Sequence, residues 1–451
     1  MKNFVKISAG ALCLLTSALS VNINAQGLVG EWSGQLEVTP QMNLRLVLHI
    51  EENAVYLDSP DQAAYGIPGD VVFLSEDSVN VNIPKIMAGF AGGRKGESLS
   101  GVFKQGVMSF PLDLEKVVRT ANRPQTPQPP FPYSTEDLII NTDAGILAGT
   151  LILPENADKT TPLVVMVTGS GQQNRDEELF DHKPFAVIAD YLARNGIASF
   201  RYDDRGVGES TGDVKTATTA DFATDAEAAV NYLRKMGRFG KIGILGHSEG
   251  GLIAYMLGAK PKTLDFIVSV AGPAIKGSKT IGYQNKMALI KAGIPEKDAD
   301  DFGKGIAAAF DYKLAHPADV GVNDALISEV YPQYNDSPVT KQLGATIKAA
   351  MSERFSNPWM KFFLAYDPAD DLRNLTIPTF IIYGDKDQQV PSSLNAEPAS
   401  QLAPKAQVTV YPGLNHLMQH AVTGAIDEYQ QIEETFSPEV LQAITTFILE
   451  K

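Results

Sequence analysis

A serine flanked by glycines is the residue of this sequence whose surroundings point most directly to chemistry. Ser248 is the centre of a G-x-S-x-G motif at residues 246–250. An apolar run at residues 242–245 precedes the motif, and a second run at residues 252–257 follows it. This pattern predicts a buried strand, a sharp turn and an apolar helix, which is the context in which the motif presents a nucleophile. Glycines are expected there because a strand that reverses into a helix leaves no room for Cβ atoms.

The same motif occurs a second time in different surroundings. Residues 208–212 also read G-x-S-x-G, around Ser210. They follow a polar run at residues 203–205 and precede a polar stretch at residues 213–220, so no helix is predicted after them. We therefore predict a surface turn there and assign the nucleophile to Ser248. The alternative for Ser248, a glycine-rich turn that only closes a βα unit, is disfavoured by the strand and helix around it.

A serine hydroxyl needs a base to accept its proton and a carboxylate to orient that base. Of the six histidines, His416 lies in a loop directly after a late predicted strand, and His420 is the second choice. Asp385 and Asp387 both follow the strand predicted before residue 384, between the serine and the histidine in chain order. The residues alone leave the choice between these two aspartates open.

An oxyanion needs two backbone N–H donors, and two segments of the sequence can supply them. The N–H of Glu249 lies at the predicted helix N-terminus, directly after the serine. Residues 168–176 follow the apolar strand of residues 163–167, and in this loop Ser170 is the best-placed donor and Gly171 the next. A phosphate-binding loop is disfavoured because no Lys-Ser/Thr pair follows the glycines. His247, inside the motif, is expected to have a packing or hydrogen-bonding role.

Length, composition and charge narrow the class of protein. The 451 residues predict two or three domains, and 44% hydrophobic with 20% charged residues is typical of a globular protein. The net charge of −15 argues against nucleic acid as a partner, since surfaces that bind it are basic. Cys13 is the only cysteine, so neither a disulfide framework nor a cysteine-ligated metal is expected.

The first 25 residues have the pattern of a signal peptide. Two lysines precede a mostly apolar run at residues 7–19, and Ala25 ends a sequence suited to cleavage. The run is too short to span a membrane, and no later segment is predicted to do so. A lipid anchor at Cys13 is disfavoured because Leu12 stands where a small residue is needed. We expect an exported protein, periplasmic or secreted.

Two regions of different pattern follow the signal peptide. Residues 26–118 contain short alternating runs between turn residues, which predicts a small all-β barrel or sandwich with Trp32 packed inside. A surface glycan or another surface partner is the candidate ligand of this domain. Residues 119–133 are proline-rich and predict an extended, semi-rigid linker. In residues 134–451 strands alternate with helices, which predicts a mostly parallel sheet flanked by helices.

The alternation pauses at about residues 273–375, and this predicts a helical cap inserted over the carboxyl edge of the sheet. Its helix-like stretches are residues 286–292, 298–314 and 340–352. Trp359 and Phe363 lie in its last part, where they either line a substrate pocket or form the core of the cap. Gly171 and Arg175, in the loop after residue 167, are the other candidates for contact with a substrate.

Four motifs together resemble the α/β-hydrolase superfamily and, within it, the EstD-like secreted carboxylesterases, a group that also includes serine aminopeptidase-like hydrolases. The motifs are GHSEGG at residues 246–251, TGSGQQNRD at 168–176, RYDDRGVGES at 201–210 and GDKDQQVP at 384–391. They occur in the order of the family, and the resemblance covers residues 134–451. It implies an α/β-hydrolase fold and a serine hydrolase that uses neither a metal nor another cofactor.

The resemblance also implies roles for single residues. In the family pattern G-x-x-D-x-x-V-P the catalytic acid matches Asp387, and the oxyanion position matches Ser170. The expected activity is cleavage of a small or medium acyl ester by Ser248, His416 and the matched aspartate through an acyl-enzyme. Amide or peptide hydrolysis and acyl transfer are the alternatives on the same triad, and a binding protein on an inactive scaffold is less favoured. An aminopeptidase needs an acidic subsite for the substrate amine, for which the candidates are Glu249, Asp176, Glu177 and Glu178.

Overall fold

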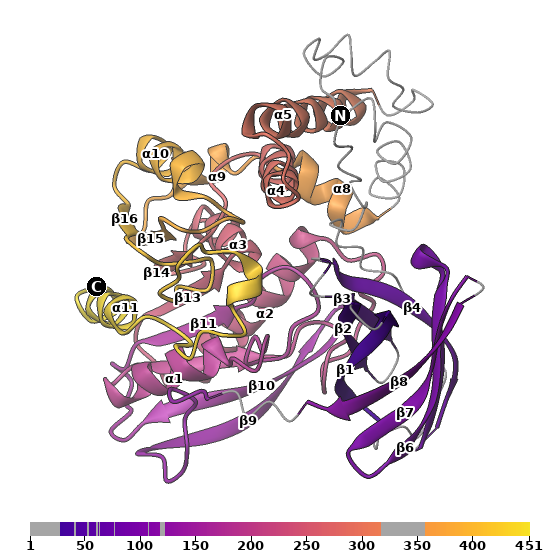
Figure 1. Ribbon diagram of the computed structural model, residues 1–451. Coiled ribbons are helices and arrows are strands. Elements are labelled where there is room, and N and C mark those ends of the chain that lie inside the picture. The colour runs from indigo at the N-terminus through magenta and orange to yellow at the C-terminus, as the bar shows by residue number, and fades with distance from the viewer. Residues whose placement is uncertain are drawn as a thin grey trace. The chain divides into compact units, whose positions relative to one another are not determined.

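The chain forms two compact units, which divide between Thr120 and Ala121. The computed structural model describes residues 28–39, 42–51, 54–59, 62, 64–75, 77–106, 108–117, 122–316 and 357–451. The predicted signal peptide of residues 1–25, with Cys13, lies outside the described residues, as does the predicted cap helix at residues 340–352. Each unit is built around its own sheet (Figure 1).

The first unit is a closed barrel of eight antiparallel strands, each paired with the next along the chain. The strands are β1 (Gly30–Thr39), β2 (Met42–Ile50), β3 (Val55–Ser59), β4 (Ala64–Leu74), β5 (Ser78–Ile83), β6 (Ala88–Lys95), β7 (Ser98–Gln105) and β8 (Met108–Lys116), with the 3-10 turn η2 (Pro84–Ile86) after β5. Pairing of β8 with β1 closes the barrel and removes the free sheet edges. The predicted all-β domain is confirmed, and of the two predicted forms the structure has the barrel.

Inward-pointing side chains fill this barrel. Trp32 is fully buried, and its indole N–H donates to the Leu28 carbonyl at 2.8 Å. Glycine makes room for the large side chains, since a Cβ at Gly92 would lie 2.7 Å from the ring of Phe90. The same glycines explain why the sequence did not indicate β6, whose small residues are poor strand formers on their own.

A histidine joins the first three strands of the barrel. His49 Nε2 lies 2.8 Å from Asp58 Oδ2, and its Nδ1 lies 3.4 Å from Glu31 Oε1. Burial lowers the pKa of His49, but the hydrogen bonds and charges of the two carboxylates outweigh burial and raise it to about 9. The charged histidine therefore stabilises the barrel at neutral pH, and this contribution is lost as the pH rises through about 9.

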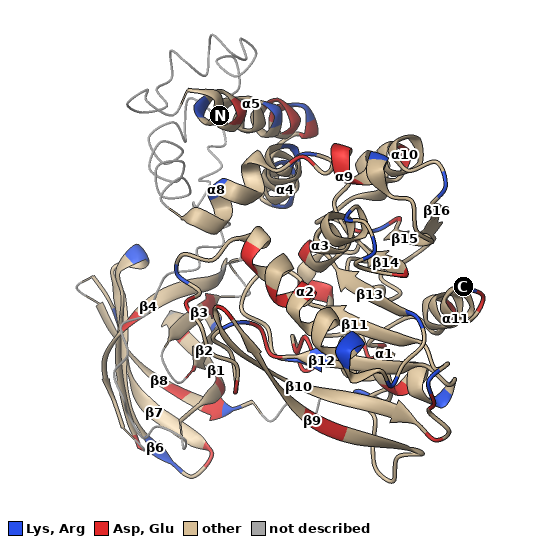
Figure 2. Ribbon diagram, turned by 180° about the vertical axis from the view of Figure 1, so that it is seen from behind, with Lys and Arg blue, Asp and Glu red and all other residues tan. Residues whose placement is uncertain are grey.

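The second unit is a mixed sheet of eight strands in the order β16-β15-β14-β13-β11-β12-β10-β9. The strands are β9 (Tyr133–Thr142), β10 (Gly145–Pro154), β11 (Leu163–Val167), β12 (Ala198–Tyr202), β13 (Ile242–His247), β14 (Phe266–Val270), β15 (Thr379–Gly384) and β16 (Gln407–Tyr411). β9 and β10 form a hairpin that joins β12 in antiparallel fashion, and the remaining pairs are parallel. β11, β13 and β14 carry no Lys, Arg, Asp or Glu (Figure 2), as expected for strands buried on both faces.

Helices cover both faces of this sheet, so the predicted architecture is confirmed (Figure 1). Two helices pack on one face, α1 (Pro184–Arg194) and α11 (Pro438–Leu449). On the other face lie α2 (Thr219–Met236), α3 (Glu249–Gly258) and α10 (Ser392–Leu402). The 3-10 turn η4 (Ile426–Glu428) precedes α11. Among the residues that the structure describes, none of the helices has the length and apolar character needed to cross a membrane.

The strand order opens a crevice at the carboxyl ends of β11 and β13. β11 leads through a loop to α1 on one face, whereas its neighbour β13 leads to α3 on the other. Ligands of open α/β sheets bind where the connections of neighbouring strands diverge in this way. The loops after β15 and β16 leave the same edge of the sheet, because all these strands are parallel.

The predicted helical insertion lies between β14 and β15. Its described helices are α4 (Gly277–Lys291), α5 (Glu296–Ala315), α8 (Pro358–Ala365) and α9 (Ala369–Asn374). α4 begins well before the predicted stretch at residues 286–292. It packs closely on α5 because each of the two helices has a glycine at their contact, Gly282 in α4 and Gly303 in α5. A Cβ at Gly303 would lie 2.5 Å from the carbonyl oxygen of Gly282. Figure 2 shows charged residues of both signs along α5, as expected for a helix partly exposed to solvent.

The proline-rich segment, predicted to be an extended, semi-rigid linker, makes hydrogen bonds to a distant part of the chain. Its described residues belong to the second unit. The guanidinium of Arg123 donates to the carbonyls of Gln430 and Ile432 at 2.9 Å. The Gln125 side chain accepts a hydrogen bond from the N–H of Thr435. Sequence patterns could not indicate this attachment, because the partners lie at the far end of the chain.

We predict that Gly250→Ala destabilises the second unit far more than Gly237→Ala. A Cβ at Gly250 would lie 2.0 Å from the Val167 carbonyl oxygen, which forces α3 away from β11 at a cost of roughly 3 kcal/mol or more. A Cβ at Gly237 meets no atom within 4 Å, so only the strain of its positive φ is added, about 1–2 kcal/mol. Urea unfolding measures both costs, and similar losses in the two variants would contradict the packing argument.

Candidate active site

The turn after β13 holds Ser248 in a backbone conformation that most residues avoid. Ser248 has φ of +53° and ψ of −114° and is the N-cap of α3. Such a conformation costs roughly 1–3 kcal/mol, which the surrounding packing must offset. A Cβ at Gly246 would lie 1.9 Å from the Gly250 carbonyl oxygen, so the turn closes only with glycine there. The Ser248 N–H donates to the Val270 carbonyl at 2.8 Å and ties the turn to β14.

A buried histidine–aspartate pair lies in the loops after β15 and β16. His416 Nδ1 is 2.7 Å from Asp387 Oδ2, and the two residues are only 4% and 3% exposed. Asp387 Oδ1 accepts from the N–H groups of Gln389 and Val390 at 2.8 and 2.9 Å, so its own loop orients the carboxylate. A carboxylate at Nδ1 favours the tautomer with the proton on that nitrogen, which leaves Nε2 as the proton acceptor.

The alternatives that the sequence left open for this pair lie elsewhere. Asp385 Oδ1 accepts from the N–H of Gly413 at 2.7 Å and so fixes the start of the loop that carries the histidine. His420 pairs with Glu434 at 2.8 Å, and its side chain is 57% exposed. Of the two aspartates, Asp387 is the one in contact with the histidine.

The loop after β11, residues 168–176, passes directly beside the serine. A Cβ at Gly169 would lie 3.3 Å from the Ser248 Cβ, so there the loop backbone approaches the turn closely. Glu249 is the first residue of α3, and its N–H has no acceptor inside the helix. A hydrogen bond joins the side chains of Ser170 and Glu249. The two residues predicted to supply N–H donors are therefore neighbours in the structure.

The carboxyl group of Glu249 is buried and receives donors from three elements. Thr219 Oγ1 of α2 and Trp359 Nε1 of α8 donate to Oε1 at 2.6 and 2.7 Å, and Ser170 provides the third hydrogen bond. Burial raises the pKa of Glu249, and these hydrogen bonds oppose the rise. This one carboxyl group thus links the cap helix α8, the loop after β11 and the turn that carries the serine.

The predicted substrate-contact residues have different surroundings. Trp359 is half-buried and stacks on Phe363, with 5.5 Å between the ring centroids. Phe363 is 6% exposed and belongs to the main core cluster, in line with the alternative of a core role. Arg175 is held by Asp203 at 2.6 Å and by Glu209 at 3.1 Å, so its guanidinium belongs to an ion-pair network.

The second G-x-S-x-G match is a turn at the surface, as predicted, with Ser210 as its one buried residue. Gly208 and Gly212 have φ values of +54° and +126°. Ser210 is 5% exposed, and its hydroxyl donates to the Asp203 carbonyl at 2.7 Å and accepts from the Ala148 N–H at 2.9 Å. Its hydroxyl is therefore a buried structural group within an otherwise exposed turn.

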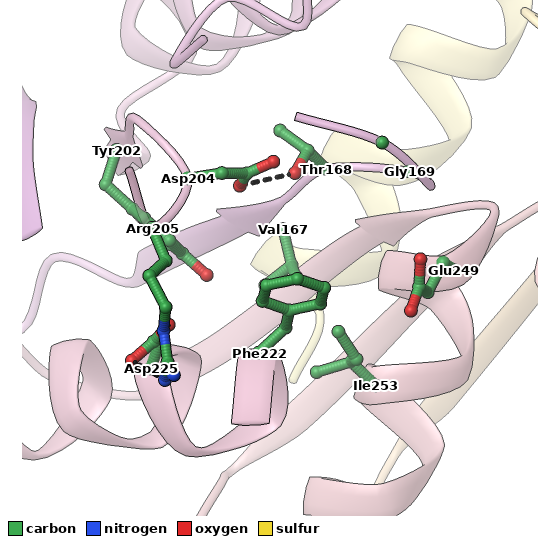
Figure 3. A pocket seen from close by; sticks show the side chains of 11 residues that line it. Val167, Thr168, Gly169, Tyr202, Asp204, Arg205, Phe222, Asp225, Glu249 and Ile253 are labelled. Carbon is green, nitrogen blue, oxygen red and sulfur yellow. Dashed lines mark hydrogen bonds and ion pairs between the residues drawn. The ribbon is translucent and has the colours of Figure 1, made fainter. Parts of the chain in front are cut away.

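A small pocket borders the loop after β11 (Figure 3). Val167, Phe222 and Ile253 form its apolar side. The predicted contact residue Gly171 is also among the residues that line it. The pocket has a volume of about 10 Å³, roughly the room that one water molecule needs. It is too small to hold a whole organic substrate without movement of its walls.

Asp204, on the wall of this pocket, fastens both ends of the loop. Its Oδ1 accepts from Thr168 Oγ1 at 2.7 Å, and its Oδ2 accepts from the N–H of Gln173 at 2.9 Å. Burial, with the nearby charges of Glu177 and Glu249, raises the pKa of Asp204 to about 8 despite these hydrogen bonds. The group that holds the loop therefore carries a proton near neutral pH.

Glu177 and His247 form a further buried pair, which the sequence did not indicate. Glu177 Oε1 accepts from the Gly169 N–H at 2.6 Å and lies 2.9 Å from His247 Nδ1. His247 Nε2 lies 3.0 Å from the His416 carbonyl oxygen, so His247 has the hydrogen-bonding role predicted for it. The partnership carries no local sequence signal, because Glu177 and His247 are far apart in the chain and meet only in the folded sheet.

A serine on a strained turn and a histidine oriented by a carboxylate are two of the groups that acyl transfer to a serine uses. Within the described part of the chain, no group of three or more His, Cys, Asp or Glu side chains is placed to hold a metal ion.

Comparison with known proteins shows the fold family of the second unit. Residues 162–421 match the family model of the alpha/beta hydrolase fold. Esterase EstD of Thermotoga maritima is 25% identical over 291 residues, which make up 64% of this chain and 61% of the esterase. The chain thus spans about 61% of the length of that relative.

Two solved structures are similar in fold. An esterase of Pyrococcus furiosus aligns with 70% of this chain and 91% of its own, with 16% identity and a TM-score of 0.43. A proline iminopeptidase of Mycobacterium smegmatis aligns with 70% of this chain and 98% of its own, with 17% identity and a TM-score of 0.42.

We predict that the protein loses stability with rising pH more steeply than its Asp204→Asn variant does, between about pH 5 and pH 8. Native Asp204 keeps its proton up to about pH 8, whereas the unfolded chain releases it near pH 4. The native state binds the extra proton over this interval, so a rise in pH favours unfolding, by at most about 1.4 kcal/mol per pH unit. Thermal unfolding of both proteins from pH 5 to pH 9 measures the difference, and parallel curves would contradict the assignment.

Proposed function

This chain belongs to the α/β-hydrolase fold family, and we propose that it is an exported serine carboxylesterase that cleaves small or medium acyl esters. The observation that carries the proposal is the buried pair of His416 and Asp387, 2.7 Å apart, in loops that leave the same sheet edge as the strained turn of Ser248. A histidine buried with its Nδ1 on a carboxylate is suited to act as a general base, and a family member needs such a base beside its serine.

In the proposed reaction Ser248 Oγ attacks the ester carbonyl while His416 Nε2 accepts the hydroxyl proton. Asp387 stabilises the imidazolium that forms, and the N–H groups of Ser170 and Glu249 hold the oxyanion. His416 then gives the proton to the departing alcohol, which leaves an acyl-serine. Water attacks this acyl-enzyme with His416 again as the base, and the acid is released.

Contact with the substrate is proposed for Trp359 and Gly171. The indole of Trp359 is fixed by its hydrogen bond to Glu249, so an aromatic ring of the cap stands beside the residue that follows the nucleophile. Gly171, with φ of +104°, lets the loop after β11 expose backbone rather than a side chain at this point. An aromatic wall and a backbone rim suit an uncharged acyl or alcohol group.

The aminopeptidase alternative is disfavoured by the partners of the acidic residues. A substrate ammonium group needs a carboxylate that is not already neutralised. Glu249 accepts three hydrogen bonds, and Glu177 is bonded to His247. Asp176 pairs with Arg201, and Glu178 lies 3.4 Å from Lys183. An ester without a free amine therefore fits this site better, whereas acyl transfer to another acceptor shares the first half of the reaction.

We predict that the mature protein hydrolyses p-nitrophenyl esters of the series acetate to laurate and that Ser248→Ala lowers kcat roughly 10⁴–10⁶-fold. Asp387→Asn is expected to cost about 10⁴-fold, because the histidine loses its orienting carboxylate. Asp385→Asn, the matched control, keeps an oxygen that can accept from Gly413 and should cost less than tenfold.

The chain-length optimum of this series measures the size of the acyl site, and a second run with an added alcohol detects acyl transfer. Equal activity of the protein and of Ser248→Ala would contradict the assigned nucleophile. Inactivity of both on every ester would contradict the esterase proposal.

Export is the second part of the proposal, supported by the charged start, the short apolar run and the small residues up to Ala25. We predict that the protein recovered from the periplasm or the medium of an expressing bacterium begins at residue 26 or close to it. N-terminal sequencing gives this result directly. A recovered chain that begins at Met1 would contradict it.

We also propose a surface glycan as the partner of the first unit. The support is an outward row across paired strands, in which exposed Phe73 aligns with Asn80, Ala91 and Val102. An exposed aromatic ring beside an amide suits the apolar face and hydroxyl groups of a sugar. We predict retention of the whole protein on polysaccharide resins and loss of retention in Phe73→Ser. Equal retention of both proteins, or of neither, would contradict this partner.

A further inference from the structure

The buried side chain of His247 connects three loops of the proposed site. Its Nδ1 lies 2.9 Å from Glu177 Oε1, and its Nε2 lies 3.0 Å from the backbone carbonyl oxygen of His416. The same Glu177 oxygen accepts from the N–H of Gly169 at 2.6 Å. His247 belongs to the turn of the nucleophile, Gly169 to the loop of the oxyanion donors and His416 to the loop of the base.

The partners of His247 determine its charge. A carboxylate oxygen and a carbonyl oxygen can only accept hydrogen bonds, so both ring nitrogens must donate. A neutral imidazole has one N–H, whereas an imidazolium has two. Both contacts are satisfied at once only when His247 is protonated.

We propose that His247 is a permanently charged positioning residue, held as an imidazolium between Glu177 and the His416 backbone, that sets the spacing of nucleophile, base and oxyanion loop. The inference rests on the proposed function, since it assigns a role in the same site. His247 exchanges no proton with the substrate in this role. The charge of His247 stays constant during the reaction, whereas the neighbouring His416 gains and loses a proton.

The geometry explains why these loops need a common fastening. Ser248 and Glu249 follow β13, His416 follows β16 and Ser170 follows β11, so three different strand ends carry these residues. Glu177 has φ of +51°, a strained value that the fold maintains while its carboxylate bonds Gly169, the residue before Ser170. Removal of the ion pair frees the N–H of Gly169 and the carbonyl of His416 together.

The charges that face His247 keep it protonated and limit its effect on the base. Burial lowers the pKa of His247, whereas the charge and hydrogen bond of Glu177 raise it, with a smaller contribution from Asp387, and the pKa lies above its ordinary value. The rings of His247 and His416 are 4.8 Å apart. Glu177 compensates the positive charge of His247. Asp387 compensates the positive charge of His416 when His416 is protonated.

The first experiment reads the charge directly in the unaltered protein. Nitrogen-15 NMR of the mature protein with labelled histidine should show, besides the ring of His49, one further ring with both nitrogens protonated from pH 6 to pH 8. This signal should be missing in His247→Gln, which assigns it. A neutral His247 ring at pH 7 would overturn the proposal, and this readout does not depend on finding a substrate.

The second experiment tests the positioning role through ester hydrolysis. Glu177→Gln keeps the shape and an oxygen that can accept from Gly169, but it removes the negative charge that compensates the His247 imidazolium. We expect kcat to fall about 10–100-fold in Glu177→Gln and in His247→Gln, with KM within threefold, and the double variant to be no worse than the poorer single variant. Glu178→Gln and His420→Gln are matched controls, because they alter the adjacent acid and the exposed His–Glu pair, and both should keep kcat within twofold.

Additive losses, or a wild-type kcat in Glu177→Gln, would overturn the positioning role. If the protein shows the NMR signal of a doubly protonated His247 ring but hydrolyses no ester, the proposed function is contradicted and the charge of His247 is established. The rate at which a fluorophosphonate modifies Ser248 measures the positioning effect without any ester substrate. This rate should fall in Glu177→Gln and in His247→Gln.

Discussion

Close approach of backbone to backbone around α3 is the constraint on which the rest of the second unit depends. A Cβ at Gly250 would overlap the Val167 carbonyl, and a Cβ at Gly251 would lie 2.8 Å from Gly272 Cα. The helix therefore starts in contact with the chain on both of its sides. This contact imposes the strained turn at Ser248, and it brings the first N–H of the helix to the crevice where the connections of β11 and β13 separate.

Neutralisation of buried charge is the second requirement of this crevice. Several carboxyl groups meet there in a medium where a lone charge is costly. The fold deals with each in a different way: Asp225 is paired with Arg205 through two bonds of 2.9 Å, Glu177 with His247, and Asp204 keeps its proton. Glu249 combines burial with three donors. Because every such group also holds a loop or a helix, charge balance and loop position depend on the same contacts.

The sequence predicted features encoded by neighbouring residues and missed those encoded by distant ones. The strand, turn and helix around Ser248 and the closing helix α11 were predictable, because apolar period and glycine spacing are local. The choice of Asp387 over Asp385 needed the family pattern, since both follow the same strand. The contact of Glu177 with His247 had no local signal. β6 was missed because its glycines serve the packing of the barrel interior and weaken the strand pattern.

The attachment of the proline-rich segment changes where the second unit begins. Arg123 and Gln125 hold the chain between residues 430 and 436, and His182 bonds Thr435 and Tyr429 in the same stretch. A fragment that contains the complete second unit, for example in a fusion protein, must therefore start before the proline-rich segment. A gene fusion cut at Tyr133 would preserve every strand of the sheet and yet leave the last connection of the fold without its anchor.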